Sequence, residues 1–159
     1  MINLWLGAST SDAQYVFLLP NKPILPDDVD EVFLAKPDSA VLIELNGNHW
    51  RKILTIIAKL IVQNYPAWRE CRDVNVFNQV GIAFSVDQLN DYKGILFVVG
   101  NTFRDQLPVS KSAEEAGVKH RAYVSYPYIW CPYLDYRQFP NILIETLREY
   151  ILEKKCLTL

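Results

Sequence analysis

The sequence has few of the residues from which metal sites and disulfide frameworks are built. It contains three cysteines and two histidines in 159 residues, with no C-x-x-C pair, and His49 and His120 lie far apart. An odd number of separated cysteines argues against a disulfide framework and against a structural zinc site. We therefore expect no metal and no cofactor, and reduced cysteines in a cytoplasmic protein.

Glycine is also scarce, at six residues, and none of the glycine-rich catalytic or phosphate-binding signatures occurs. The absent patterns are G-x-x-x-x-G-K-[ST], G-x-G-x-x-G and G-x-S-x-G, and the zinc-protease pattern H-E-x-x-H is missing too. Single glycines such as Gly47 and Gly100 do not make a phosphate loop. Nothing in the sequence therefore assigns the protein to a known class of nucleotide-binding enzyme.

The sequence also lacks a large excess of either charge, and it lacks long hydrophobic runs. Lys and Arg number 16 and Asp and Glu 18, for a net charge of −2, so no excess of positive charge indicates nucleic acid. The longest apolar run, "ILTIIAKLIV", has ten residues and contains Lys59. This is too short to cross a bilayer, and the first 12 residues are a poor signal peptide. The sequence does not indicate an oligomeric state.

What is present is an ordinary globular composition, with 50% hydrophobic and 21% charged residues. Apolar runs alternate with helical patterns, which is typical of βαβ units. We expect one domain over residues 1–159, a three-layer α/β fold with a mostly parallel sheet and helices on both faces. Strands are predicted at 2–6 and 15–19, which could form a hairpin, and at 40–45, 94–100 and 121–126. Helices are predicted at 26–36, 49–64, 85–94 and 139–155, with a further start at 112–115.

Three predicted strands are followed at once by polar or aromatic segments, at 46–50, 100–105 and 127–141. Ligands of open α/β sheets bind beyond the carboxyl ends of the strands. If these strands are parallel and adjacent, the three segments meet at one edge of the sheet. The candidate ligand-binding residues are Asn46, Asn48, Asn101, Thr102, Arg104, Trp130, Tyr133, Tyr136 and Arg137. The candidate catalytic residues are Asp105, Asp135 and His49.

Each candidate also has a structural interpretation. His49, Asn46 and Asn48 lie where a helix begins and could cap or pack there. Asp135 and Arg137 could form a network that ties their loop to the sheet, and Arg104 and Asp105 could pair with other surface groups. The aromatic residues could pack in the core. Cys131 has no histidine nearby in sequence and is better explained as a buried apolar residue than as a nucleophile.

The last third of the chain, residues 94–155, resembles the C-terminal part of uracil-DNA glycosylase-like proteins. The resemblance lies in "GILFVVG", then a second strand, and then "CPYLDYRQFPNILIETL", a loop with proline and aromatic residues before the final helix. Pro132 matches the proline of that family's His-Pro-Ser segment. The resemblance implies an α/β fold and glycosylase-like chemistry. The chain also resembles an uncharacterised bacterial protein family.

These observations leave three hypotheses. The first is a domain that binds a small planar or anionic ligand at the carboxyl ends of its strands, with arginines holding the polar group and tyrosines stacking on the ring. The second is a glycosylase-like hydrolase, in which Asp105 or Asp135 activates water. The third is a protein-interaction module that uses the aromatic loop.

Overall fold

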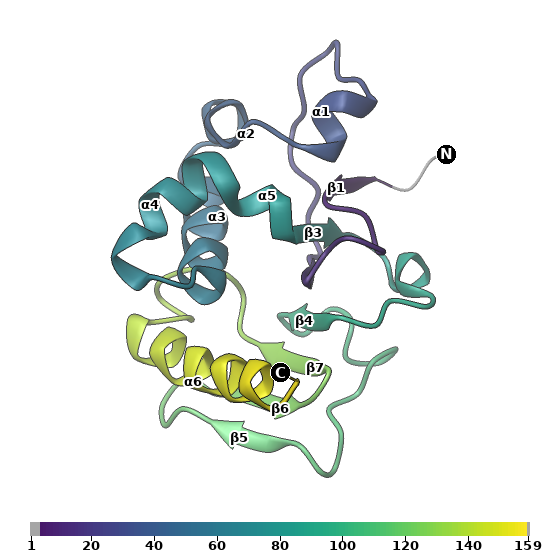
Figure 1. Ribbon diagram of the computed structural model, residues 1–159. Helices are drawn as coiled ribbons and strands as arrows, with labels where there is room; N and C mark the ends of the chain where they lie inside the picture. The colour runs from purple at the N-terminus through teal and green to yellow at the C-terminus, as the bar shows by residue number, and fades with distance from the viewer. Residues whose placement is uncertain (1–3, 159) are drawn as a thin grey trace.

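A seven-stranded sheet forms the centre of the computed structural model, which describes residues 4–158 and the side chains of residues 4–153 (Figure 1). The strand order is β1-β3-β2-β4-β7-β6-β5. In chain order the strands are β1 (Trp5–Gly7), β2 (Tyr15–Leu18), β3 (Val80–Ala83), β4 (Ile95–Val99), β5 (Glu114–Ala116), β6 (Ala122–Ser125) and β7 (Tyr128–Cys131).

The sheet is mixed, so the expectation of a mostly parallel sheet holds only for its centre. β3, β2, β4 and β7 are parallel neighbours, whereas β1 pairs with β3, β6 with β7, and β5 with β6 in the antiparallel sense. The central strands are buried almost completely, as unbroken apolar runs predict. Phe17 of β2 lies opposite Phe97 of β4, and their rings stack 4.3 Å apart between centroids.

The helices cover one face of the sheet. They are α1 (Glu31–Ala35), α2 (Ser39–Asn46), α3 (Asn48–Ile61), α4 (Trp68–Glu70), α5 (Val76–Gln79) and α6 (Asn141–Thr158), with the short helices η1 (Tyr65–Ala67) and η2 (Cys71–Asn75). Figure 1 shows α3 to α6 gathered on the same side of the strands. Their apolar side chains share one core with Phe17, Phe97 and Ile129 of the sheet. The predicted long helices at 49–64 and 139–155 are confirmed as α3 and α6.

The opposite face of the sheet has a separate, smaller core. Val16, Leu18, Val98 and Trp130 point into it, and the residues that cover them come from the short helix η3 (Val86–Leu89) and from the chain between 103 and 113. Because loops rather than long helices cover this face, the expectation of helices on both faces is not confirmed. The predicted capping box at 85–88 is present at the start of η3.

The predicted strand at 40–45 is wrong, because this segment is α2. Asp38 caps the helix: its Oδ1 accepts hydrogen bonds from the backbone N–H groups of Ala40 at 2.9 Å and Val41 at 3.4 Å. An apolar run of six residues does not by itself distinguish a strand from a helix segment. The Asp38 cap precedes the run and stabilises the helical conformation.

The predicted hairpin of 2–6 and 15–19 is also wrong, because β3 lies between β1 and β2. Residues 2 and 3 of this prediction lie outside the described part of the chain. The helix start predicted at 112–115 is instead the beginning of β5, which pairs with β6.

The predicted strand at 121–126 is confirmed as β6, but it runs antiparallel to its neighbour β7. β7 occupies residues that the sequence assigned to a loop. The turn at Tyr126–Pro127, whose peptide bond is cis, joins β6 to β7 directly, and strands joined by so short a turn must be antiparallel. The assumption that strands at 40–45, 94–100 and 121–126 run side by side in one direction is therefore wrong.

Candidate functional site

The carboxyl ends of β2, β4 and β7 meet at one edge of the sheet, which we call the carboxyl edge. Leu18 of β2 lies opposite Val98 of β4, and Val99 of β4 lies opposite Cys131 of β7. The segments that leave this edge begin at residues 19, 100 and 132. Of the three predicted segments, 100–105 and the part of 127–141 that follows β7 therefore do leave from a common edge. The second reaches it through β7 and not through β6.

The third predicted segment, 46–50, reaches the carboxyl edge by a different route, as the junction of α2 and α3. The His49 Nε2 atom and the Tyr133 hydroxyl share a hydrogen bond of 2.5 Å, and their rings stack with centroids 5.7 Å apart and an angle of 28° between planes. The Asn21 Nδ2 group donates to the same hydroxyl at 3.4 Å. We call these three residues the His49 cluster. It joins the exit of β2, the exit of β7 and the first turn of α3.

Two glycines near the His49 cluster, Gly47 and Gly100, have open space around them. Gly47 precedes α3 with φ +70°, and a Cβ placed on it would have no heavy atom within 4 Å. Gly100 follows β4 with φ +72°, and a Cβ there would meet only Tyr133 Cδ1, at 3.9 Å. Both glycines have backbone angles that disfavour other residues. Ligand atoms could therefore come close to the main chain at both positions.

The first turn of α3 has no side-chain cap, because its N-cap residue is Gly47. The first N–H groups of a helix lack partners within the helix, and the helix dipole places partial positive charge there. α3 has 14 residues. The combination of these N–H groups with an imidazole and a hydroxyl is chemically suited to a carbonyl or anionic group.

Asn46 and Asn48, two residues apart, have different surroundings. The Asn46 side chain donates to the carbonyl oxygens of Ile24 and Leu42, at 2.9 Å each, and accepts from the Ile24 N–H at 2.7 Å. Its hydrogen-bonding groups therefore fix the 20s loop to the end of α2, a structural role that differs from the cap at a helix start predicted from the sequence. Asn48 is the first residue of α3 and is exposed at the carboxyl edge.

The loop after β7 runs along α3. Asp135 Oδ1 lies 3.8 Å from Lys52 Nζ and accepts a hydrogen bond from the Arg137 N–H at 3.1 Å. The Tyr136 ring is 44% exposed, with Lys59 Nζ 5.7 Å from its centroid. The Arg137 side chain is exposed. Asp135 thus links its loop to α3, whereas the network predicted from the sequence tied the loop to the sheet through Asp135 and Arg137.

Trp130 and Arg104 belong to the other face of the sheet. Trp130 is buried, and its Nε1–H donates to the Leu107 carbonyl at 2.9 Å. The Arg104 guanidinium carbon lies 5.7 Å from the centroid of the Tyr123 ring. The structure therefore does not bring these two residues to the His49 cluster. Trp130 packs on the opposite face because side chains of a strand alternate and Trp130 follows Ile129, which points to the helices.

The remaining candidates lie in the turns after Gly100. Asn101, Thr102 and Asp105 are exposed, and the Arg104 N–H donates to the Asn101 carbonyl at 3.2 Å. Asn101 and Thr102 follow β4 at the carboxyl edge. Cys131, at the end of β7, is fully buried, and burial raises the pKa of its thiol. A thiol with a raised pKa is a poor nucleophile, so the interpretation of Cys131 as an apolar core residue is confirmed in its burial.

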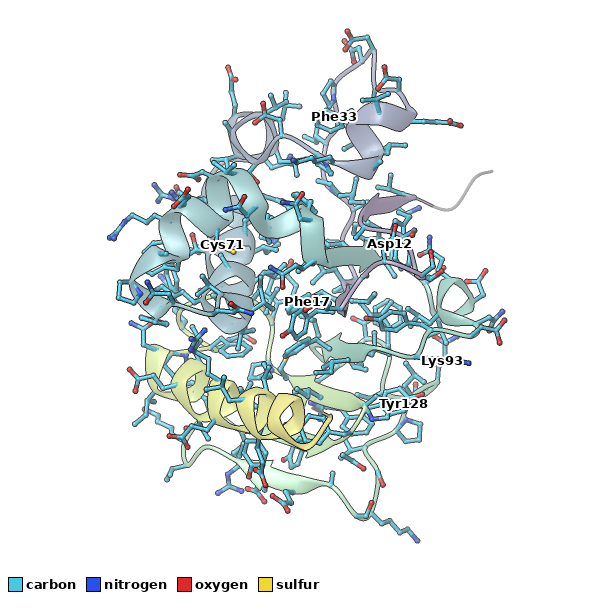
Figure 2. All side chains as sticks on the ribbon, in the orientation of Figure 1. Asp12, Phe17, Phe33, Cys71, Lys93 and Tyr128 are labelled. Carbon is cyan, nitrogen blue, oxygen red and sulfur yellow. The ribbon has the colours of Figure 1, made fainter. Side chains whose placement is uncertain are left out.

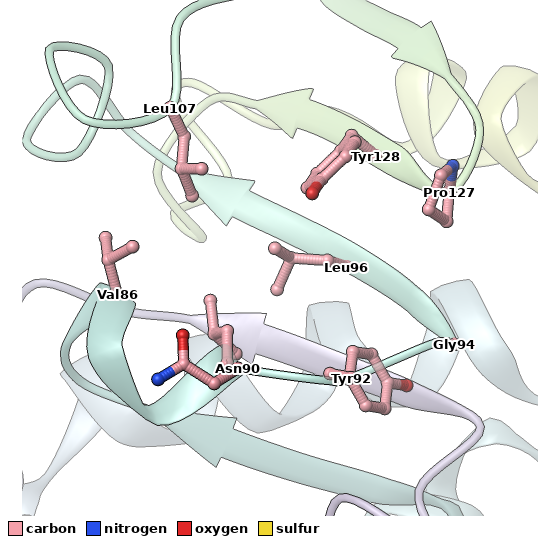
Figure 3. Close-up of a pocket in the computed structure, with 9 residues that line it drawn as sticks. Val86, Asn90, Tyr92, Gly94, Leu96, Leu107, Pro127 and Tyr128 are labelled. Carbon is pink, nitrogen blue, oxygen red and sulfur yellow. The ribbon is translucent and has the colours of Figure 1, made fainter.

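A cavity of about 190 Å³ lies on the loop-covered face, at the opposite ends of β4 and β7 (Figure 3). Leu96 forms its floor, and Tyr92 and Tyr128 lie on two sides of it, with the Asn90 amide at the rim. The Tyr92 hydroxyl donates to the Ala13 carbonyl at 3.0 Å, and burial raises its pKa. This cavity was missed from the sequence because the rule for ligand sites in α/β sheets selects only residues that follow strands.

Asn21, Lys52 and Lys59 were also missed. Asn21 had a usable signal, because "YVFLLPNK" shows the same change from an apolar run to polar residues as the three chosen segments. The two lysines had none, since they lie on the polar face of a helix. In the described part of the chain, no group of three or more His, Cys, Asp or Glu side chains could hold a metal ion. None of the described helices is both long and apolar enough to cross a membrane.

Comparison with known proteins finds one family, described as a family of unknown function, whose match covers residues 6–152. No curated protein and no solved structure matches the chain. The expected membership of an uncharacterised family is thereby confirmed. The resemblance to uracil-DNA glycosylase-like proteins has no support from these comparisons.

Proposed function

Because the chain belongs to the family of unknown function DUF6942, we propose a function from the site itself. The protein binds a small ligand with a flat ring and an anionic or carbonyl group at the carboxyl edge. The observation that carries this proposal is the stacked, hydrogen-bonded pair of His49 and Tyr133 at the uncapped first turn of α3.

The flat ring of the ligand would stack on the His49 imidazole. His49 is exposed, although Tyr133 stacks on one side of it, so part of its ring is accessible to a third ring. Aromatic rings prefer such offset stacking, which adds about 0.5–1.5 kcal/mol beyond the buried area. The pair holds its geometry because the ring contact and the hydrogen bond constrain the same two side chains.

The polar group of the ligand would accept hydrogen bonds from the first turn of α3. Gly47 leaves these N–H groups without a side-chain cap, and a Cβ placed on Gly47 would meet no heavy atom within 4 Å. The Asn21 amide, which already reaches Tyr133, supplies a further donor from the exit of β2. An anion at a helix N-terminus is stabilised by the dipole as well as by the hydrogen bonds.

Hydrolysis is less well supported than binding. A carboxylate that acts as a general base must be available to water, and Asp135 is engaged by Lys52 and by the Arg137 N–H. Asp105 lies in an exposed turn, and within the described residues neither carboxylate forms a hydrogen bond or an ion pair with His49. The contacts of the site therefore favour a ligand that is held and not cleaved.

A protein-interaction module is favoured by one observation away from the carboxyl edge. Val118 and Ile142, which are 86% and 72% exposed, line an apolar hollow of about 460 Å³ between the β5–β6 turn and the start of α6. Light scattering over a dilution series tests the simplest case, self-association. A monomer at all concentrations would remove that case.

The test of ligand binding is a thermal-shift screen over nucleobases, nucleotides and small carboxylic acids. A ligand at 100 times its Kd stabilises the folded state by about 2.7 kcal/mol, which for a chain of this size raises Tm by about 5–10 °C. We expect His49→Ala and Tyr133→Leu to abolish the shift. His120→Ala is the matched control, because it removes the other histidine, beside the β5–β6 turn.

A ligand that shifts the Tm of His49→Ala and His120→Ala by the same amount would contradict the proposed site. Tyr133→Phe separates the two parts of the pair. It keeps the ring but removes the hydroxyl that His49 and Asn21 contact. We expect it to weaken binding less than Tyr133→Leu does.

A further inference from the structure

We propose that a second site, centred on Trp68 of α4, binds phosphate groups. It consists of Trp68 and the three cations around its ring, Lys59 of α3, Arg69 of α4 and Arg72 of η2, and we call it the Trp68 cluster. Lys59 lies ten residues after His49 in α3, about 15 Å along the helix at 1.5 Å per residue. The two sites are therefore separate, and either could exist without the other.

The three cations converge on one indole ring. Lys59 Nζ lies 4.8 Å from the Trp68 ring centroid, and the guanidinium carbons of Arg69 and Arg72 lie at 4.4 and 5.3 Å. All three distances are within the range of cation–π attraction. The elements that carry them come together because α4 and η2 pack against α3 (Figure 1). Three positive charges are thus held in a small area around a half-buried ring.

One of the three charges is already neutralised. Arg72 Nε donates to Asp73 Oδ1 at 2.9 Å, and its Nη1 donates to Thr55 Oγ1 at 3.1 Å. These bonds fix the guanidinium against α3 and leave part of its fork of donors for a ligand. Arg72 is therefore the anchored member of the cluster.

Within the described side chains, the other two cations form no ion pair. Lys59 Nζ donates to Asn141 Oδ1 at 3.1 Å, a neutral amide oxygen. Among residues 4–153, neither Lys59 nor Arg69 forms an ion pair with a carboxylate. Glu70 follows Arg69 in the chain and is exposed, yet it is not paired with either cation.

The crowding of these charges has an electrostatic cost. Burial, and then the positive charge of Arg69, lower the pKa of Lys59. The lowering means that the charged ammonium is disfavoured where it stands. An anion in contact with Lys59 would offset the effect of Arg69, and it would do so most strongly if it carried two charges.

Phosphate fits this arrangement better than a carboxylate. A phosphate monoester or inorganic phosphate carries close to two negative charges at pH 7 and several strong acceptor oxygens. Two uncompensated cations and the remaining donors of Arg72 match that charge and that number of acceptors. A carboxylate would neutralise only one of the two.

The experiment is a titration with inorganic phosphate and with pyrophosphate, followed by calorimetry and by the indole N–H resonance of Trp68 in ¹H–¹⁵N NMR spectra. Ionic strength is held constant with sodium chloride, and sodium acetate is the carboxylate comparison. We expect phosphate to shift the Trp68 resonance and acetate to bind more weakly. Trp68→Phe identifies the resonance by its loss.

Substitutions decide whether the Trp68 cluster is responsible. Lys59→Gln and Arg69→Gln should each weaken phosphate binding by about tenfold, the effect of one charge-assisted hydrogen bond. Lys93→Gln is the control, because it makes the same charge change on the opposite side of the molecule. Figure 2 shows Lys93 on one side and Cys71, the neighbour of Arg72 in the chain, on the other. Lys93→Gln should leave the affinity unchanged.

Three results would overturn the proposal: wild-type affinity in both Lys59→Gln and Arg69→Gln, an equal shift with chloride alone, or equal weakening by Lys93→Gln. Arg69 is exposed, so its variant tests binding without disturbing the core. The same titration of His49→Ala shows whether phosphate binding depends on the carboxyl edge. Phosphate binding that is lost in His49→Ala but kept in Lys59→Gln would place the anion at α3's first turn instead.

Discussion

Replacing Asn46 by alanine tests whether this residue is structural or functional. Asn46 is one of the ligand-binding candidates predicted from the sequence, and its side chain forms three hydrogen bonds with the main chain. Two of these bonds hold Ile24, and the third reaches back one turn of α2 to Leu42. Alanine removes all three and leaves the main-chain groups of the 20s loop to water.

The expected cost is about 2 kcal/mol. A typical hydrogen bond contributes about 0.5–1.5 kcal/mol net. The two bonds to Ile24 are exposed and should lie at the lower end of that range, because water can replace the lost partner, whereas the bond to Leu42 is partly buried. For a chain of this size, a loss of about 2 kcal/mol lowers Tm by about 4–8 °C.

Urea titration followed by circular dichroism measures this difference, and Asn48→Ala is the matched control. Asn48 is the same residue type two positions later, exposed at the start of α3, and its substitution should change the free energy of unfolding by less than about 0.5 kcal/mol. Equal stability of the two variants would refute the assignment of Asn46 as the residue that fixes the 20s loop. Asn46→Ala should also bind an edge ligand as the wild type does once it is folded.

Two further predictions concern the loop-covered face. Trp130→Phe loses the hydrogen bond to the Leu107 carbonyl and should lower the free energy of unfolding, measured by urea titration, by about 2 kcal/mol. Tyr128→Phe, on the same strand but 37% exposed, should cost less than about 0.5 kcal/mol. Equal costs for the two variants would place Trp130 outside the core. Burial raises the pKa of Tyr92, so its hydroxyl stays protonated in the folded state while it ionises near pH 10 in the unfolded chain. Its contribution to stability is complete below about pH 10 and is lost as pH rises further, so the free energy of unfolding should fall as pH rises above about 10, and fall less in Tyr92→Phe. An identical fall in both proteins would contradict the prediction.

The long, strongly patterned elements could be predicted from the sequence. The apolar spacing of "HWRKILTIIAKLIVQN" gave α3, and the unbroken apolar run "GILFVVG" gave β4. Short segments could not. Residues 40–45 have a composition that suits a strand, yet the Asp38 cap makes them helical. Residues 128–131 follow a proline and resemble a loop, yet they pair with β4.

The candidate site was partly predictable for a physical reason. The rule that ligands bind at the carboxyl ends of strands selected 100–105 and 127–141, and residues 100–105 and the residues after β7 do leave from that edge. The same rule selected Trp130 and Arg104, which point to the other face, because a segment chosen from sequence does not tell which of its side chains face the edge. Tyr133 and His49, 84 positions apart in the chain, meet only through the packing of α3 against the loop after β7.

Local composition by itself determined an α/β chain with a buried sheet and two long helices, since hydrophobic periodicity and helix caps act over a few neighbouring residues. Strand order, strand direction and the face on which each aromatic residue lies were decided only by the tertiary structure. These depend on which apolar surfaces bury one another across the whole chain, and no stretch of ten or fifteen residues contains that information.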